Sequence, residues 1–182
     1  MIGYLAASLT GAWRLARLKP DGFAWFDLSA DGFWRSFLAM PVAAPLFLGF
    51  VAAQAGGGPL DAGTLVVQLL SYFVVWCLFL GLMVPFARFF GLGPGYVPFV
   101  VAYNWAQVLM LMLFLPLTLL RAAGVMPGLM NVVIVLLMAF GMVYVGVLAR
   151  FGLRADWPQT VAVVLIEMVT SYAIPELVDA IF

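Results

Sequence analysis

The chain has 182 residues, of which 66% are apolar, 15% aromatic and only 9% charged, and its eight basic and eight acidic residues cancel. Its mean hydropathy is +1.17. A typical soluble domain is about 45–50% apolar and about 25% charged, so this composition excludes a water-soluble globule, a disordered chain, a collagen and a coiled coil. The class that remains is an all-α integral membrane bundle with several transmembrane helices.

The residue inventory excludes several chemistries. The chain contains no histidine and a single cysteine, Cys77, which excludes histidine-ligated haem or zinc, histidine-based catalysis and an intrachain disulfide. Cys77 is expected to be a small apolar residue of the core. Zero net charge provides no basic field for nucleic acid. We therefore expect no enzyme activity, no catalytic, cofactor-binding or metal site, no cofactor and no nucleic-acid partner.

The first 35 residues are expected to lie on the membrane surface without crossing it. Apolar residues recur there at helical spacing, while Thr10, Arg14 and Arg17 fall on other sides of the helix. The apolar positions are Ile2, Leu5, Ala6, Leu9, Trp13 and Ala16. This pattern is typical of an amphipathic interfacial helix whose arginines face lipid phosphates.

Aromatic residues follow this helix and precede the first membrane span. Clustered Trp and Phe residues at this point are typical of the aromatic belt at a membrane interface. Ser29 is expected to cap a helix that has Asp31 in its first turn. The segment is interpreted as a passive anchor or, alternatively, as a surface that senses curvature or docks a partner. Its predicted contacts with lipid or the interface are Trp13, Arg14, Arg17, Trp25, Trp34 and Arg35.

Five later stretches are each long and apolar enough to cross a membrane as a helix, which takes about 20 residues. Their connections are short, so neighbouring spans are expected to be antiparallel. The chain is therefore divided into a surface segment, residues 1–35, and one five-helix transmembrane domain, residues 36–182. The predicted spans cover residues 36–53, 64–86, 97–120, 129–149 and 160–182.

Basic residues are distributed unequally about these spans. Seven of the eight would lie on the side of the N-terminus, and only Arg121 on the other side. Positive charge collects on the cytoplasmic side of membrane proteins. We therefore expect a cytoplasmic N-terminus and a C-terminus outside. The richness in Ala, Gly and Leu, together with Arg as seven of the eight basic residues, favours the cytoplasmic membrane of a bacterium.

Polar residues within the predicted spans are the candidates for function, because burying them in a bilayer costs free energy. Asn104 and Gln107 share one face of the third span, and Glu167 lies at a similar depth in the fifth. Tyr144 of the fourth span falls in the same layer. These four residues are expected to form an intramembrane cluster. The alternatives are a hydrogen-bonded clasp, a site that handles protons or cations, and a water-filled crevice.

Two short sequence features carry a family resemblance. Residues 27–34 read Asp-Leu-Ser-Ala-Asp-Gly-Phe-Trp, and Gly95-Tyr96 begins the third span. Together with the five closely spaced spans, they resemble the Yip family, whose eukaryotic members are Rab-interacting membrane proteins. That family has an Asp-Leu-x-Gly-Pro-Phe-Trp-like stretch before its first span, whereas here two residues are added and the proline is missing. The resemblance covers nearly the whole chain, and prokaryotic relatives share the bundle without Rab partners.

The sequence thus predicts a non-enzymatic, multi-pass, Yip-like membrane protein that acts as an organiser or adaptor. Its expected partners are membrane lipids and either another membrane protein or a second copy of itself. The alternative is a small transporter or channel, coupled to protons or a solute, that uses Glu167 with Asn104 and Gln107. A third hypothesis is a catalytically silent subunit of a larger membrane enzyme.

Overall fold

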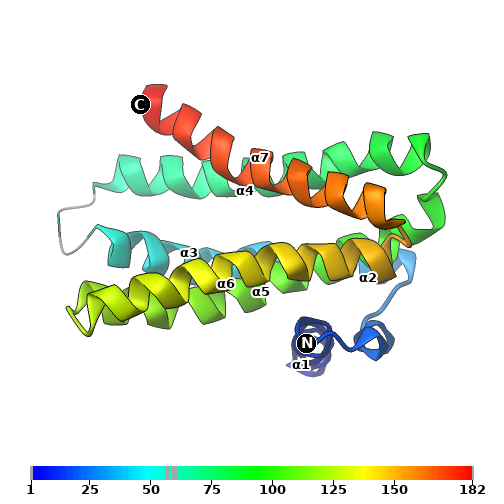
Figure 1. Cartoon of the computed structure of the whole chain (residues 1–182), viewed down its shortest axis with the longest axis horizontal. Helices are drawn as coiled ribbons and strands as arrows, with labels where there is room; N and C mark the ends of the chain where they lie inside the picture. Colours follow the sequence, from blue (N-terminus) through cyan, green and yellow to red (C-terminus); the bar gives the residue numbers. More distant parts are fainter. Residues whose placement is uncertain (1, 56–57, 59–60, 182) are drawn as a thin grey trace.

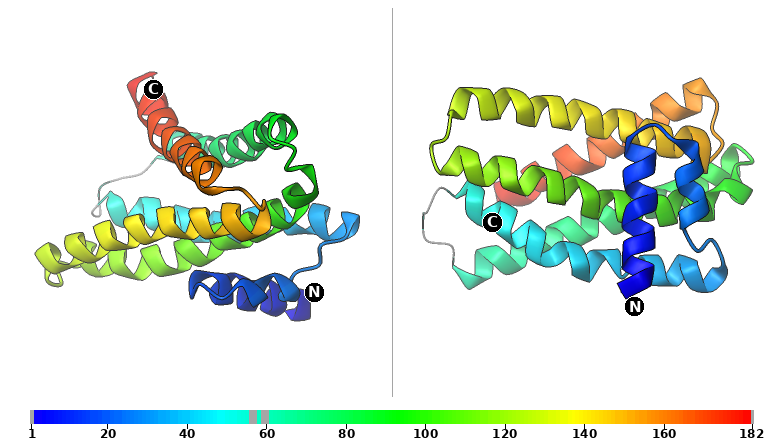
Figure 2. Two further views of the ribbon diagram at one scale, coloured as in Figure 1. Left: turned by 45° about the vertical axis from the view of Figure 1, so that its right-hand side comes forward. Right: turned by 90° about the horizontal axis from the view of Figure 1, so that it is seen from below.

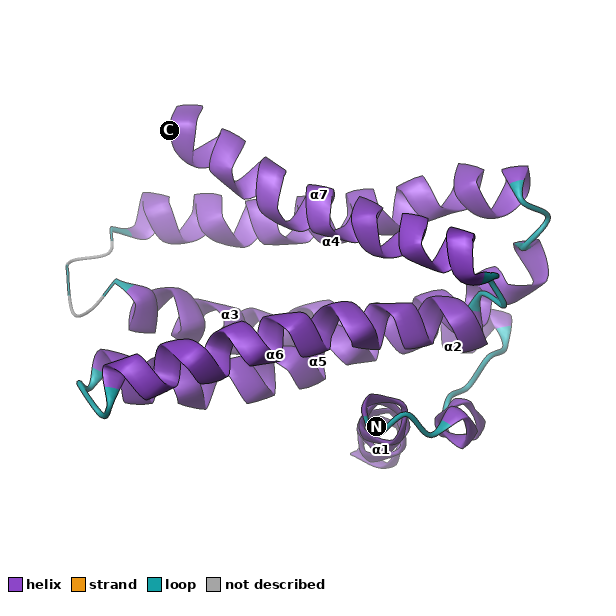
Figure 3. Ribbon diagram, viewed as in Figure 1, coloured by secondary structure: helices purple, strands orange, loops and turns teal. Residues whose placement is uncertain are grey.

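The structure, a computed structural model, describes residues 2–55, 58 and 61–181, and for residues 173–181 the backbone alone. The described residues form helices and no strand (Figure 3). The expected all-helical class is therefore confirmed. In chain order the helices are α1 (Ile2–Ala16), η1 (Pro20–Trp25), α2 (Ala30–Ser36), α3 (Ala39–Gln54), α4 (Ala62–Phe89), α5 (Gly93–Ala122), α6 (Pro127–Val147), η2 (Leu148–Gly152) and α7 (Trp157–Ile181).

The long helices form two layers. One layer holds α3, α5 and α6, and the other holds α4 and α7 (Figure 1). The helices α1 and η1 lie on the outer face of the first layer, where α1 runs across the long helices (Figure 2). They lie nearer to the end of the bundle where α4 connects to α5. We call this the α1 end, and the end where α5 connects to α6 the opposite end.

Helix α5 forms the centre of the bundle. It contacts α1, α2, α3, α4, α6 and η2. Its residues 99–106 are all buried, so more than two turns are covered on every side. A helix that is apolar around its whole circumference belongs in an interior, as α5 does. Because α5 contacts both layers and α1, it fixes the positions of the other helices.

Four helices in the described part of the chain are long and apolar enough to cross a membrane. They match the first four predicted spans and indicate an integral membrane protein. The predicted fifth span corresponds to α7, which is not among the four, and its last residue, Phe182, lies outside the described residues. So do residues 56–57 and 59–60 of the loop after the first span. The four helices are Ala30–Gln54, Ala62–Phe89, Gly93–Ala122 and Pro127–Gly152.

The first span starts earlier than predicted and is interrupted. Ser29 caps α2 as expected, its hydroxyl accepting a hydrogen bond from the backbone N–H of Gly32 at 3.1 Å, and Asp31 lies in the first turn. The interruption between α2 and α3 falls at Phe37, four residues before Pro41. Proline lacks the N–H that would bond to the carbonyl four residues earlier, and its ring clashes with that carbonyl.

The predicted N-terminal helix is present as α1, but its buried face differs from the predicted apolar stripe. The buried residues are Ser8, Gly11, Ala12, Leu15 and Ala16, of which only Ala16 belongs to the stripe. Ile2 and Trp13 of the stripe are exposed. Small residues allow close packing here, because a Cβ on Gly11 would meet the carbonyl oxygen of Gly22 at 2.9 Å.

Apolar side chains also cover the outside of the bundle, as they do where a helix faces lipid. On α4 the exposed positions Val66, Leu70 and Val74 recur every four residues and form one stripe. Cys77 is exposed as well, so its predicted place in the core is wrong. A membrane span can present apolar residues to lipid, and apolar character therefore does not predict burial there.

The start of α5 lies against the loop that follows η2. A Cβ on Gly95 would meet the backbone of Leu153, with the carbonyl oxygen at 2.4 Å and Cα at 2.7 Å. These atoms are backbone and cannot rotate away. Gly95 therefore permits the close contact that joins α5 to the end of α6. Gly93, on the same first turn, would meet nothing within 4 Å.

We expect Gly95→Ala to lower the apparent unfolding temperature in detergent, because the added methyl forces these backbones apart at a cost of about 1–3 kcal/mol. Gly93→Ala is the matched control and leaves the temperature unchanged or slightly raised. Thermal circular dichroism of both purified variants measures the effect. Equal unfolding temperatures for the two variants would contradict the close contact.

Candidate functional site

Asn104 is completely buried and joins three helices by hydrogen bonds. Its side-chain oxygen accepts a bond from the indole N–H of Trp76 on α4 at 2.8 Å. Its amide group donates to the hydroxyl of Ser36 on α2, also at 2.8 Å. That hydroxyl in turn donates to the carbonyl of Phe33. Asn104 therefore forms a clasp between α2, α4 and α5, and not the predicted contact with Glu167.

Tyr144 holds α1 against α6. Its hydroxyl donates a 2.7 Å hydrogen bond to the backbone carbonyl of Ala12, and the side chain is buried. Edge-on packing of Tyr4 against Trp105 adds a contact between α1 and α5, with ring centroids 5.7 Å apart. The guanidinium of Arg35 lies over the Tyr4 ring at 4.7 Å. These contacts make α1 part of the bundle.

The same interface buries polar atoms that have no partner among the described residues. They are the hydroxyls of Tyr4 and Ser8 and the indole N–H of Trp105. An unpaired buried polar group costs about 1–3 kcal/mol. These unpaired polar groups therefore offset part of the free energy gained by packing α1 against the bundle. The Tyr144 hydrogen bond consequently contributes a larger share of the free energy that holds α1 in place.

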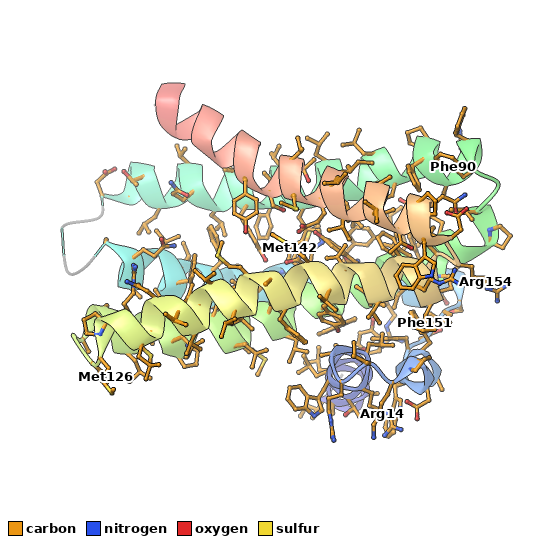
Figure 4. The ribbon with its side chains drawn as sticks, in the orientation of Figure 1. Arg14, Phe90, Met126, Met142, Phe151 and Arg154 are labelled. Carbon is orange, nitrogen blue, oxygen red and sulfur yellow. The ribbon has the colours of Figure 1, made fainter. Side chains whose placement is uncertain are left out.

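A cavity of about 650 Å³ lies between the two layers. Met142, which lines it, is labelled between the layers in Figure 4. The cavity reaches Gln54 and Arg121, which lie near the ends of α3 and α5 at the opposite end of the bundle. The other end of the cavity lies in the middle of the bundle. On each helix, the lining residue nearest the α1 end marks where the cavity stops.

Glu167 is the lining residue of α7 nearest the α1 end, and we call this part of the cavity its floor. The corresponding residues are Trp76 on α4 and Tyr103 on α5, with Tyr144 close to the same level on α6. The carboxylate of Glu167 accepts a hydrogen bond from the hydroxyl of Ser171 at 3.0 Å. Gln107, one turn after Tyr103, also lines the cavity.

The structure thus divides the four residues of the predicted cluster. Glu167, Gln107 and Tyr144 line one cavity, whereas Asn104 lies in the buried clasp. Sequence reasoning missed Trp76 and Tyr103. Two signals point to them: a buried indole N–H requires an acceptor, and Tyr103 precedes Gln107 by four residues and so shares its face.

The predicted interface residues surround the α1 end. Trp13 and Trp25 are each 46% exposed and Trp34 is 71% exposed, while Arg17 and Arg35 are also exposed. Further exposed aromatic residues lie at the end of α4 and at the start of α7. Together these residues form an aromatic rim around this end of the bundle. The rim consists of Trp13, Trp25, Trp34, Phe89, Phe90, Phe151 and Trp157.

Basic residues accompany the rim. Arg88 ends α4, Arg150 belongs to η2, and Arg14 and Arg154 are labelled at this end in Figure 4. Arg14 donates to the carboxylate of Asp21 in η1, with 3.2 Å between Nε and Oδ1, and this bonding lowers the pKa of Asp21. Arg121 is the basic residue of the opposite end.

Comparisons with protein-family models, with curated proteins and with solved structures find no match for this chain. The resemblance to the Yip family therefore rests only on the residues quoted above.

Replacing Asn104 tests the clasp. Asn104→Leu keeps the side-chain size but removes the acceptor of the Trp76 indole N–H, which we expect to destabilise the bundle by about 1–3 kcal/mol. The control is Asn131→Leu, at an exposed position on α6. Thermal unfolding in detergent is the measurement. An Asn104→Leu protein as stable as the control would show that the clasp contributes nothing to stability.

Proposed function

We propose that the protein is a five-span membrane protein of the bacterial cytoplasmic membrane, with α7 as its fifth crossing. In this proposal the α1 end faces the cytoplasm and the C-terminus lies outside. The support is the unequal distribution of charge, since seven of the eight basic residues belong to the elements of the α1 end. Positive charge of this kind is retained on the cytoplasmic side.

We further propose that it is non-enzymatic and serves as a membrane organiser or adaptor, as its resemblance to the Yip family implies. The aromatic rim is the single observation that carries this proposal. Exposed Trp and Phe residues alternate there with arginines, a combination suited to anionic lipid headgroups and to a partner's membrane-proximal surface. Protein interfaces are likewise enriched in aromatic residues and Arg.

The attachment of α1 makes the rim a defined surface. Trp13 belongs to a helix whose other face is buried against α5, and Trp34 belongs to α2, which also contacts α5. A surface whose side chains are held by rigid elements loses less conformational entropy on binding than a free amphipathic tail. The N-terminal segment would then act as a docking platform as well as an anchor.

The cavity favours a second candidate function, a small transporter or channel. Glu167 and Gln107 line a space that reaches one end of the bundle. Polar side chains that line a cavity within a membrane protein are typical of substrate and ion pathways. In this candidate Asn104 has a structural role, because its hydrogen bonds are made within the clasp.

The proposed orientation predicts where single cysteines react. In a Cys77→Ala background, Val125→Cys between α5 and α6 should react with a membrane-impermeant maleimide on intact cells. Phe90→Cys between α4 and α5 should react only after permeabilisation. Both positions are exposed, at 44% and 42%. Reversed labelling would overturn the orientation, and equal labelling on intact cells would exclude a crossing by α5.

The organiser proposal predicts a partner whose capture depends on the rim. The tagged protein, extracted from its own membranes in nanodiscs, should retain a stoichiometric protein partner identified by mass spectrometry. A double variant, Trp13→Ala with Trp25→Ala, should lose most of that partner, because both rings are exposed on the platform.

The matched control replaces two exposed apolar residues of α6, Val135→Ala with Leu136→Ala, and should retain the partner. Equal loss in both double variants would show that binding does not involve the rim. A homo-oligomer that retains only lipid in every variant would contradict the adaptor role and favour transport.

A further inference from the structure

We propose that the cavity between the two layers is a binding site for a small organic ammonium ion that carries an apolar or aromatic group, with Glu167 as its counter-charge. This inference rests on the second candidate function, since it names the ligand class of that cavity. It does not depend on the organiser role.

The size and lining of the cavity suit a small molecule. Its volume of about 650 Å³ lies within the usual range of ligand sites, about 300–1,000 Å³. Most of the wall is apolar, with aromatic and methionine side chains from α3, α5 and α6, and fewer polar side chains interrupt it. Such a lining accommodates an apolar body and selects for the polar head that it carries.

The charge at the floor selects a cation. Glu167 is the acidic residue among the described residues that line the cavity, and it is half-buried. The basic residue of the lining is Arg121, fourteen positions after Gln107 on α5, which corresponds to about 21 Å along a helix. That separation is far beyond the N–O distance of about 4 Å at which an ion pair forms. The floor therefore presents an acid without a neighbouring base.

Aromatic rings next to the floor favour an organic cation over a bare metal ion. Phe47 and Tyr72 stack with centroids 4.2 Å apart, and Tyr72 meets Trp76 edge-on at 5.4 Å. All three side chains line the cavity. Aromatic faces attract ammonium groups, most strongly where water is excluded. A metal ion would require several oxygen ligands, and the described residues contain no group of three or more His, Cys, Asp or Glu residues that could hold one.

An unpaired hydroxyl independently indicates a polar ligand. The Tyr72 hydroxyl is buried and has no hydrogen-bond partner among the described residues, although its side chain lines the cavity. A buried polar atom without a partner is unfavourable, and a ligand N–H would supply one. A primary ammonium has three such donors. It can therefore pair with a carboxylate and donate to a hydroxyl through separate N–H groups.

The test compares 2-phenylethylammonium with 2-phenylethanol, a neutral molecule of similar size that also forms hydrogen bonds. Affinities for the purified full-length protein in nanodiscs are measured by calorimetry or saturation-transfer NMR. We expect the ammonium to bind at least about tenfold more tightly than the alcohol. Glu167→Gln should abolish this preference and leave the affinity for the alcohol unchanged within about twofold. Asp31→Asn, which removes an exposed acid of α2, should retain the preference.

A preference for the ammonium that survives Glu167→Gln would overturn the proposal, as would equal affinities for the two probes in the unaltered protein. Tighter binding of phenylacetate than of the ammonium would also overturn it, since it would assign the cavity to anions.

A second measurement on the unaltered protein covers the case in which Glu167→Gln does not fold. Dicyclohexylcarbodiimide, which modifies carboxyl groups in apolar surroundings, should label Glu167 in a peptide identified by mass spectrometry. Phenylethylammonium should slow this labelling and phenylethanol should not. Labelling that both probes slow equally, or neither slows, would refute the proposed site.

Binding and transport are separated by one further assay. If the ammonium binds through Glu167 but does not cross liposomes that contain the protein, the ligand site stands and the transporter function fails. If a neutral solute crosses but the ammonium does not bind, transport stands and the proposed ligand class fails.

Discussion

The burial of residues 99–106 of α5 on every side is the constraint on which the rest of the bundle depends. A helix with no lipid-facing stripe over residues 99–106 must be enclosed by other helices, and α1, α3, α4 and α6 provide that enclosure. Within this stretch Asn104 would be costly if it were unpaired. Its bonds to Trp76 and Ser36 fix how α2 and α4 are rotated about α5. Packing is therefore densest at the middle of the bundle and towards the α1 end.

The half of the bundle near the opposite end contains fewer buried residues. The buried residues of α4 run from Val75 to Ala87, towards the α1 end, and those of α6 begin at Tyr144. Beyond the floor the layers enclose a cavity instead of a core. Polar side chains are tolerated within a membrane bundle where they face such a cavity instead of lipid. The dense half thus closes the cavity on one side, and Glu167 lies at that boundary.

The sequence predicts the helices well and the contacts between them poorly. Length and apolar character locate the first four spans, although the first starts at Ala30 instead of residue 36, because a bilayer imposes both. Residue counting also places Asn104, Gln107, Glu167 and Tyr144 at similar depths. Depth, however, does not determine rotation about the helix axis, and rotation directs Asn104 to Trp76 while Gln107 lines the cavity. Apolar character likewise cannot separate exposed Cys77 from buried Trp76. The face of α1 was predicted on the assumption of a lipid partner, whereas small residues such as Gly11 allow it to pack on protein.

Tyr144 connects α1 with the helices that enclose the cavity. Tyr144 is one of the residues that line the cavity, and its hydroxyl is bonded to the Ala12 carbonyl of α1. That hydroxyl makes a hydrogen bond at an interface where Tyr4, Ser8 and Trp105 have unpaired polar atoms, so α1 has little compensation for losing it. A substitution of Tyr144 therefore alters the lining of the cavity and the attachment of α1 together.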